Sequence, residues 1–221
     1  MEALQHARKE WNVDIISLSF GFNKPDIEDE IRKEIKTCQH SDIVVFAAAS
    51  NDGGHQPRTY PGRYPGVVCI HSATAMGTPS DFNPTFVHGA DNFMCMGEYV
   101  RSWWPKSIPT KGSDPSDGWK RMSGTSFATP VAISTAVFMI GYIRKNMPNH
   151  RWNVPPLSID GIRFIFQLLS CGNERGGYGF LSTEYLFAKY SDESHVRSLL
   201  IDGLHGYQSR TSLTGEWHGH G

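Results

Sequence analysis

Two short apolar runs with an amphipathic stretch between them constrain the fold of this 221-residue chain more than any other feature. The runs are 13–20 (VDIISLSF) and 43–49 (IVVFAAA), and both are rich in the residue types that favour strands. Between them Ile27, Ile31 and Ile35 recur at every fourth position among charged residues, which predicts a surface helix with one buried stripe. A strand, a helix and a strand within about 35 residues have the size of a parallel βαβ unit.

The same alternation continues on both sides of this unit. The segment 67–70 (VVCI) predicts a third strand, and residues 2–12 have the composition of a helix that precedes the first strand. Near-continuous apolar strands alternating with helices are typical of a parallel sheet that is covered on both faces. The sequence therefore predicts an α/β fold with a mainly parallel sheet.

A long apolar helix is predicted over residues 127–145. Its apolar stretch falls short of the roughly 20 residues that a membrane span requires, and it contains Thr129, Pro130 and Ser134. A helix that is apolar on all sides and too short to span a membrane is expected inside a protein core. We therefore expect no membrane partner.

The remaining segments carry weaker patterns. Residues 80–118 are rich in Pro, Gly, Asp and Ser, with one plausible strand at 99–103. Beyond Pro148, helical patterns cover 159–169 and 183–189, and we expect the terminal segment 215–221 to be frayed.

Charge and cysteine content exclude several classes of protein. The chain has 21 basic and 22 acidic side chains, so its balance gives no reason to expect nucleic acid as a partner. Cys38, Cys69, Cys95 and Cys171 form no CxxC pair, which favours four buried thiols over a zinc site or a disulfide framework. The first fifteen residues have no continuous apolar core, so they predict neither a signal peptide nor an anchor, and no compartment is assigned.

The segment 123–130 reads SGTSFATP and leads into the long apolar helix. Ser126 stands at the mouth of this helix, where free N–H groups and the positive end of the helix dipole lie. Such a position suits a nucleophilic serine, because the same N–H groups can stabilise the oxyanion formed by attack on a carbonyl. A serine at a helix start is also commonly a simple N-cap, so the position alone leaves both roles open.

The octet SGTSFATP closely resembles the nucleophile motif of the subtilases, the subtilisin-like serine peptidases. Three further segments resemble parts of that family and follow in the family order. Residues 13–21 are similar to the strand beside the substrate groove, 43–51 to the strand that ends in the oxyanion asparagine, and 60–68 to the loop and strand after it. The resemblance implies a three-layer, subtilisin-like α/β fold with a mainly parallel sheet.

By this resemblance Ser126 is the nucleophile and Asn51 is a side-chain donor to the oxyanion. An asparagine amide suits that task because it donates a hydrogen bond without carrying a charge. Asn51 also begins an Asn-Asp-Gly-Gly bend, and its role as a turn residue is compatible with the role as a donor.

The resemblance also implies a polypeptide substrate and a pocket for its primary side chain. The pocket residues it implies are Ser19, Phe20, Gly21, Ala48, Ala49 and Ser50. The edge of the adjoining strand could add an extended peptide as a further strand. Two residues depart from the family pattern and are expected to add bulk near the groove: Phe22 replaces a small residue, and Ser50 replaces the glycine before the oxyanion asparagine.

The family's catalytic Asp and His have no counterpart that we can place in this sequence. A serine hydroxyl needs an imidazole to take its proton and a carboxylate to orient that imidazole. In subtilases both residues precede the segments matched here, so we expect the N-terminal strands and helices of the family fold to be missing. Five histidines precede Ser126 without the family's His-Gly-Thr context, namely His6, His40, His55, His71 and His88. Asp14 is likewise not expected to be the triad aspartate.

These observations predict the back part of a subtilase catalytic domain over 1–149 and a helical extension with a flexible tail over 150–221. The predicted function is that of a serine-type endopeptidase acting through an acyl-enzyme. We expect this chain to be inactive because the catalytic Asp and His are absent from it. The chain is then either part of a full subtilase or a catalytically inactive relative that binds peptides, and a generic α/β protein with coincidental motifs is a third reading. No cofactor is expected; structural calcium is common in the family, but no compact carboxylate loop identifies a site.

Overall fold

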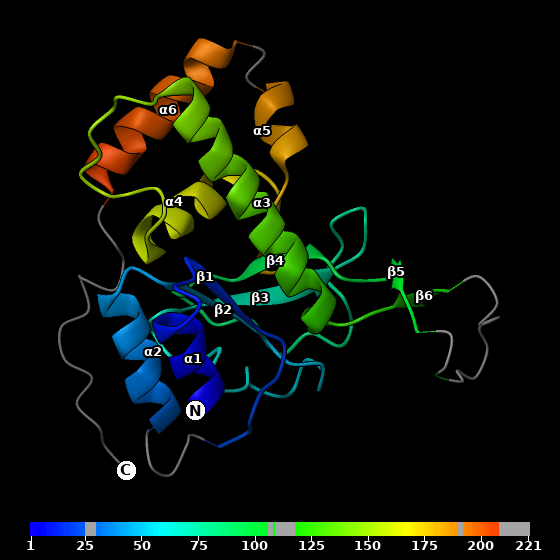
Figure 1. The fold of residues 1–221 in the computed structure, drawn as a ribbon. Coiled ribbons are helices and arrows are strands. Elements are labelled where there is room, and N and C mark those ends of the chain that lie inside the picture. Colours follow the sequence, from blue (N-terminus) through cyan, green and yellow to red (C-terminus); the bar gives the residue numbers. More distant parts are fainter. Residues whose placement is uncertain (25–29, 106–107, 109–117, 190–191, 208–221) are drawn as a thin grey trace.

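The computed structural model of the chain describes residues 1–24, 30–105, 108, 118–189 and 192–207. Within them a six-stranded sheet forms the centre of the molecule, with the order β1-β2-β3-β4-β8-β7 (Figure 1). The strands are β1 (Ile15–Leu18), β2 (Val44–Ala48), β3 (Val67–Ala73), β4 (Phe93–Met96), β7 (Glu174–Arg175) and β8 (Tyr178–Phe180).

The sheet is mainly parallel, as the sequence predicts. Strands β1 to β4 pair in parallel in chain order, with Ile15 opposite Val44 and Val45 opposite Val67. Strand β8 joins β4 in parallel, and only β7 runs antiparallel. The crossover from β1 to β2 is the predicted helix α2 (Glu30–His40), which completes the βαβ unit.

Helices cover both faces of the sheet. On one face α1 (Glu2–Lys9) and α2 pack against alternate strand residues such as Ile16 and Val45, with Ile35 of the predicted stripe fully buried. On the other face lie α3 (Thr125–Asn146) and α4 (Ile159–Ser170), with α5 (Thr183–Lys189) and α6 (Glu193–Gly206) beyond them (Figure 1). Successive strand side chains point to opposite faces, so β2 supplies Phe46 to this second core.

Helix α3 crosses the sheet on β2, β3 and β4, as the prediction of a core helix requires. Of the helices that the structure describes, α3 alone is long and apolar enough to cross a membrane, so the expectation that it is too short for a span is wrong. Its sheet-facing residues include Ala128, Ala132 and Ala136, whose small side chains let the helix approach the strands closely. The outer side differs from the prediction of burial all round, since Val137 and Phe138 are each more than half exposed.

The part of the chain after residue 149 contributes strands as well as helices. The predicted helices at 159–169 and 183–189 are α4 and α5, and the described part also contains α6. Strands β7 and β8, which the sequence pattern does not predict, extend the sheet beyond β4. Leu200 and Leu204 of α6 belong to the same core as Phe46. The domain boundary at 149 stays a prediction, and the segment 215–221 lies outside the described residues.

Strands β5 (Val100–Trp103) and β6 (Trp119–Met122) form a separate antiparallel pair. This hairpin projects away from the sheet and its covering helices, next to the start of α3 (Figure 1). β5 agrees with the strand predicted at 99–103, whereas β6 is not predicted.

Three of the four cysteines are buried thiols, as predicted, and all four are free. Burial raises the pKa of the Cys95 thiol to about 11, so it stays protonated. The prediction is wrong for Cys171, which is exposed because it ends α4 at the surface.

Candidate active site

The start of α3 opens onto a cavity of about 370 Å³ at the carboxyl ends of β1 and β2. Crevices at the carboxyl ends of parallel strands are the usual binding sites of open α/β sheets. The lining residues are Ser19, Phe20, Gly21, Asn23, Ala48, Ser50, Asn51, Asp52, Thr59, Thr125 and Ser126. The structure thus brings together every site residue expected from the sequence except Ala49.

Ala49 lies behind the pocket wall. Its side chain is fully buried, and its carbonyl accepts a hydrogen bond from the Thr59 amide at 2.9 Å. Ala48 precedes it and lines the pocket, because consecutive residues of an extended chain point to opposite sides. Of the two alanines expected in the pocket, Ala48 lines it and Ala49 is not among the lining residues; contact of either with substrate stays a prediction.

Four lining residues were missed at the level of sequence: Asn23, Asp52, Thr59 and Thr125. Thr125 and Asp52 directly follow motif residues, so their positions in the two motifs could have identified them. Thr59 and Asn23 lie in loops without a pattern of their own, and only the folded arrangement brings them to the pocket.

The side-chain amide of Asn51 is oriented by Thr125. Its Oδ1 accepts hydrogen bonds from the Thr125 amide at 2.8 Å and from the Thr125 hydroxyl at 3.1 Å. An amide whose oxygen is held by two donors has its Nδ2 left to donate. Nδ2 lies beside Gly124, where an added Cβ would stand 3.1 Å from it at a φ of +154°, so this position requires glycine.

A second donor is the backbone N–H of Ser126. The amides of Phe127 and Ala128 both donate to the Gly124 carbonyl, and the Thr125 amide donates to Asn51. No residue in the described part of the chain accepts a hydrogen bond from the Ser126 amide. This N–H and Asn51 Nδ2 are therefore two preorganised donors at the positive end of a 22-residue helix.

The Ser126 hydroxyl donates to the Ser19 carbonyl at 3.2 Å, and the Ser19 hydroxyl donates to the Ser126 carbonyl at 3.1 Å. No histidine is among the described residues that line the pocket. The one carboxylate there, Asp52, accepts a hydrogen bond from the Ser50 hydroxyl at 2.7 Å. His71 is fully buried in β3, its Nδ1 3.1 Å from the Phe93 carbonyl oxygen, and burial lowers its pKa to about 3.

The two departures from the family pattern differ in their effect. Ser50 lines the pocket and has a φ of +131°, a conformation that glycine adopts without strain. Phe22 does not line the pocket: its backbone exchanges hydrogen bonds with Tyr60, and its ring packs 5.7 Å from that of Phe20. Only Ser50 therefore adds bulk inside the pocket.

The described residues offer few groupings of side chains that could bind a metal ion. No three His, Cys, Asp or Glu residues among them lie close enough together to hold a metal ion. The described part of the chain therefore identifies no residues for the structural calcium that is common in the family.

The family model described as the subtilase family, peptidase S8, matches residues 1–153. The chain is 31% identical over 137 residues to the subtilisin-like protease het-Q2 of Podospora anserina, which covers 59% of this chain and 35% of that protein. It is 25% identical over 195 residues to the major intracellular serine protease of Bacillus subtilis (strain 168), covering 86% of this chain and 56% of that protein. The chain thus spans between about a third and somewhat over half of these relatives.

Solved structures show the same fold at low sequence identity. A lanthipeptide protease superposes with a TM-score of 0.65 at 18% identity, covering 86% of this chain and 65% of that one. The prenylagaramide maturation protease PagA superposes with a TM-score of 0.61 at 20% identity, covering 93% of this chain and 66% of that one. The predicted subtilisin-like α/β fold is confirmed. Because the family model matches 153 of the 221 residues, the chain belongs to the subtilase family.

Proposed function

We propose that this chain carries the nucleophile and the oxyanion site of a serine endopeptidase. Subtilases are serine peptidases, so peptides are the substrate class of the family. The observation that carries the proposal is the pair of donors beside the Ser126 hydroxyl, Asn51 Nδ2 and the Ser126 N–H, with Thr125 holding the Asn51 amide in place.

The proposed reaction begins when Ser126 Oγ attacks the carbonyl carbon of a peptide bond and gives its proton to a base. Negative charge then develops on the carbonyl oxygen, where the two donors stabilise it. Collapse of this intermediate breaks the C–N bond, the leaving amine takes up the proton, and an acyl group remains on Oγ. Water then attacks the acyl carbon, which releases the acid and restores the serine.

The proton of Ser126 has no suitable acceptor in the described pocket lining. Its hydrogen-bond partner is the Ser19 carbonyl, which is far too weak a base to take the proton. We therefore propose that the 221-residue chain alone has negligible peptidase activity, and that turnover needs an imidazole base beyond those lining residues.

A catalytically inactive peptide-binding protein is the second candidate. It is favoured by the same bond from Ser126 to Ser19, which holds the hydroxyl on a backbone carbonyl instead of a base. Both candidates use the same pocket and differ in whether an imidazole can activate Ser126.

Labelling with a fluorophosphonate tests the proposal, because only an activated serine reacts. We expect the purified chain to label no faster than Ser126→Ala, and we expect high concentrations of free imidazole to produce labelling at Ser126. Mass spectrometry of the labelled peptide identifies the residue. If imidazole produces no labelling while peptides bind in the pocket, the peptide-binding candidate is correct. Hydrolysis without imidazole that is lost in Ser126→Ala would refute the proposed inactivity.

A further inference from the structure

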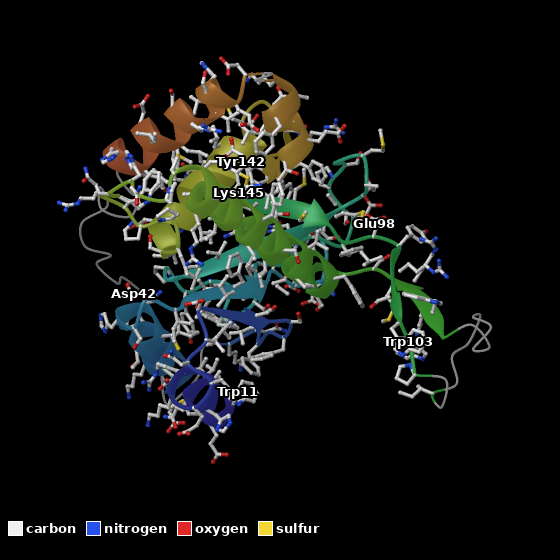
Figure 2. The ribbon with its side chains drawn as sticks, turned by 45° about the horizontal axis from the view of Figure 1, so that its top comes forward. Trp11, Asp42, Glu98, Trp103, Tyr142 and Lys145 are labelled. Carbon is white, nitrogen blue, oxygen red and sulfur yellow. The ribbon has the colours of Figure 1, made fainter. Side chains whose placement is uncertain are left out.

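The β5–β6 hairpin presents two arginines and two tryptophans on one exposed face. In its register Arg101 stands directly opposite Arg121, and Trp103 directly opposite Trp119. Directly opposite residues share a face, and so do residues two apart in a strand, so the four side chains lie together. All four residues are exposed, and Trp103 lies on the part of the hairpin that projects from the body (Figure 2). We call these four residues the Arg/Trp face.

Among the described residues, the two guanidinium groups contact a ring and a backbone carbonyl instead of a carboxylate. Arg101 lies over the Trp119 ring, with its Cζ 4.8 Å from the ring centroid. Arg121 donates through Nη1 to the Tyr99 carbonyl at 3.2 Å. No ion pair joins either arginine to a carboxylate of the described residues. Like charges directly opposite each other disfavour strand pairing, and an anion bound between them would remove that repulsion.

The hairpin is tied to the segment that carries Ser126. The Tyr99 amide donates to the Ser123 hydroxyl at 3.0 Å, and the Gly124 amide donates to the Gly97 carbonyl at 2.9 Å. These bonds anchor the base of the hairpin on both sides to the start of α3. Since a chain extends at most about 3.6 Å per residue, Arg121 lies within about 18 Å of Ser126. An extended peptide in the pocket can therefore reach the Arg/Trp face within about six residues.

We propose that the Arg/Trp face binds acidic segments of the polypeptide that is handled at Ser126. Guanidinium groups form paired, charge-assisted hydrogen bonds with carboxylates, and the indole rings can cover the aliphatic stems of Glu side chains. The occupant is taken to be a polypeptide because the face adjoins the proposed peptide site, and in this respect the inference rests on the proposed function. A net charge of −1 gives no general attraction for nucleic acid.

The test is a binding measurement on the whole chain with three labelled peptides of equal length, built from Glu and Gly, Gln and Gly, or Lys and Gly. Fluorescence anisotropy at low and high salt gives the affinities. We expect the Glu peptide to bind about tenfold or more tightly than the Gln peptide at low salt, with the preference reduced at high salt. The Lys peptide should bind more weakly than the Gln peptide.

A double variant, Arg101→Gln with Arg121→Gln, should lose this preference. The matched control is Arg144→Gln with Lys145→Gln, which removes the same charge from the exposed last turn of α3. Lys145 lies on α3 over the body of the molecule, away from the hairpin (Figure 2). The control should keep the full preference. The variant Arg101→Lys with Arg121→Lys keeps the charge and should retain part of it, which separates loss of binding from misfolding.

Three outcomes would overturn the inference. One is a double variant that still prefers the Glu peptide, and another is a control that loses the preference equally. The third is an oligothymidylate that binds through the same two arginines more tightly than the Glu peptide. The proposed function is judged separately, because the Glu preference should persist in Ser126→Ala. If the chain prefers the Glu peptide but Ser126 is not labelled by the fluorophosphonate, the peptidase proposal fails and the acidic-peptide site stands. If Ser126 is labelled but the Glu peptide is not preferred, the acidic-peptide site fails and the peptidase proposal stands.

Discussion

Ser19 and Ser126 exchange two hydrogen bonds, each hydroxyl donating to the backbone carbonyl of the other, at 3.1 and 3.2 Å. In an α-helix the Ser126 carbonyl would accept from the amide four residues later, but that residue is Pro130, which has no N–H. The Ser19 hydroxyl therefore supplies a donor that the helix lacks. The same bonds fix the end of β1 against the start of α3, and so set the width of the pocket between them.

Replacing Ser19 by alanine should lower the free energy of unfolding by about 0.5–1.5 kcal/mol, since the Ser126 carbonyl loses its donor. Equilibrium urea denaturation measures this change. Ser134→Ala is the matched control: its exposed hydroxyl donates to the Pro130 carbonyl, which keeps a helical N–H partner, so the loss should be smaller.

The same Ser19→Ala substitution should also be measured in a Pro130→Ala variant. Alanine restores an N–H four residues after Ser126, so the Ser126 carbonyl no longer depends on Ser19. The cost of Ser19→Ala should then shrink markedly. An equal cost in both backgrounds would show that the hydroxyl does not substitute for the missing helical donor.

Asn51→Asp should slow fluorophosphonate labelling in the presence of imidazole while leaving the fold intact. The aspartate keeps an oxygen for the two Thr125 donors but replaces the Nδ2 donor with a second acceptor. In subtilisin, itself a member of this family, losing such a donor costs about 10²–10³ in kcat, and by analogy labelling should slow by a similar order. Labelling of Asn51→Asp at the wild-type rate would remove Asn51 from the oxyanion site.

Ser50→Gly should raise the free energy of unfolding by about 1 kcal/mol. At a φ of +131° a residue with a Cβ is strained by about 1–3 kcal/mol, whereas glycine loses only about 0.4–1 kcal/mol through the entropy of the unfolded chain. Ser50→Ala separates the causes, because it keeps the backbone strain and loses both hydrogen bonds of the hydroxyl to Asp52, one donated to the carboxylate and one accepted from the backbone amide. Thermal melts should rank the glycine variant above wild type and the alanine variant below it. A glycine variant that melts below wild type would show that the hydrogen bonds of the hydroxyl matter more than the backbone strain.

The strands inside strong apolar runs, β1, β2 and β3, were predictable, and so was β5, whereas β4, β6, β7 and β8 were not. β2 is fully buried and five residues long, so its composition identifies it, whereas β4 has four residues inside a Gly- and Asn-rich stretch. β7 and β8 are shorter still and exist through pairing with β4 and with each other, which no local pattern encodes.

The candidate site divides in the same way. Ser126 and Asn51 could be found because each stands in a recognisable local motif. The bonds that orient them, from Thr125 to Asn51 and between Ser19 and Ser126, join residues far apart in sequence. The absence of Ala49 from the pocket lining follows from its direction after the end of β2, which depends on where pairing in the sheet ends. Such relationships depend on register and packing, so only the folded arrangement shows them.

The last prediction concerns His71, whose imidazole is fully buried in β3. Burial, and next the nearby charge of Arg58, lower its pKa to about 3, against about 6.5 in an unfolded chain. Above pH 6.5 the imidazole is neutral in both the folded and the unfolded chain, so His71 contributes no pH dependence to the free energy of unfolding there. Below that value the unfolded chain binds a proton that the folded chain does not, so stability falls as the pH falls, until the folded state protonates near pH 3.

The expected slope from this residue is about 1.4 kcal/mol per pH unit between roughly pH 6 and pH 4. Urea denaturation across this range should show it for the wild type. His71→Leu should be less stable at pH 8, because the Phe93 carbonyl loses the contact with Nδ1, yet its stability should fall less steeply with acid. Equal slopes for the two proteins would mean that the folded state accommodates a charged imidazole at this position. A flatter slope in the variant would identify His71 as a main source of acid sensitivity, because burial in β3 and the charge of Arg58 both disfavour a charged ring in the folded state.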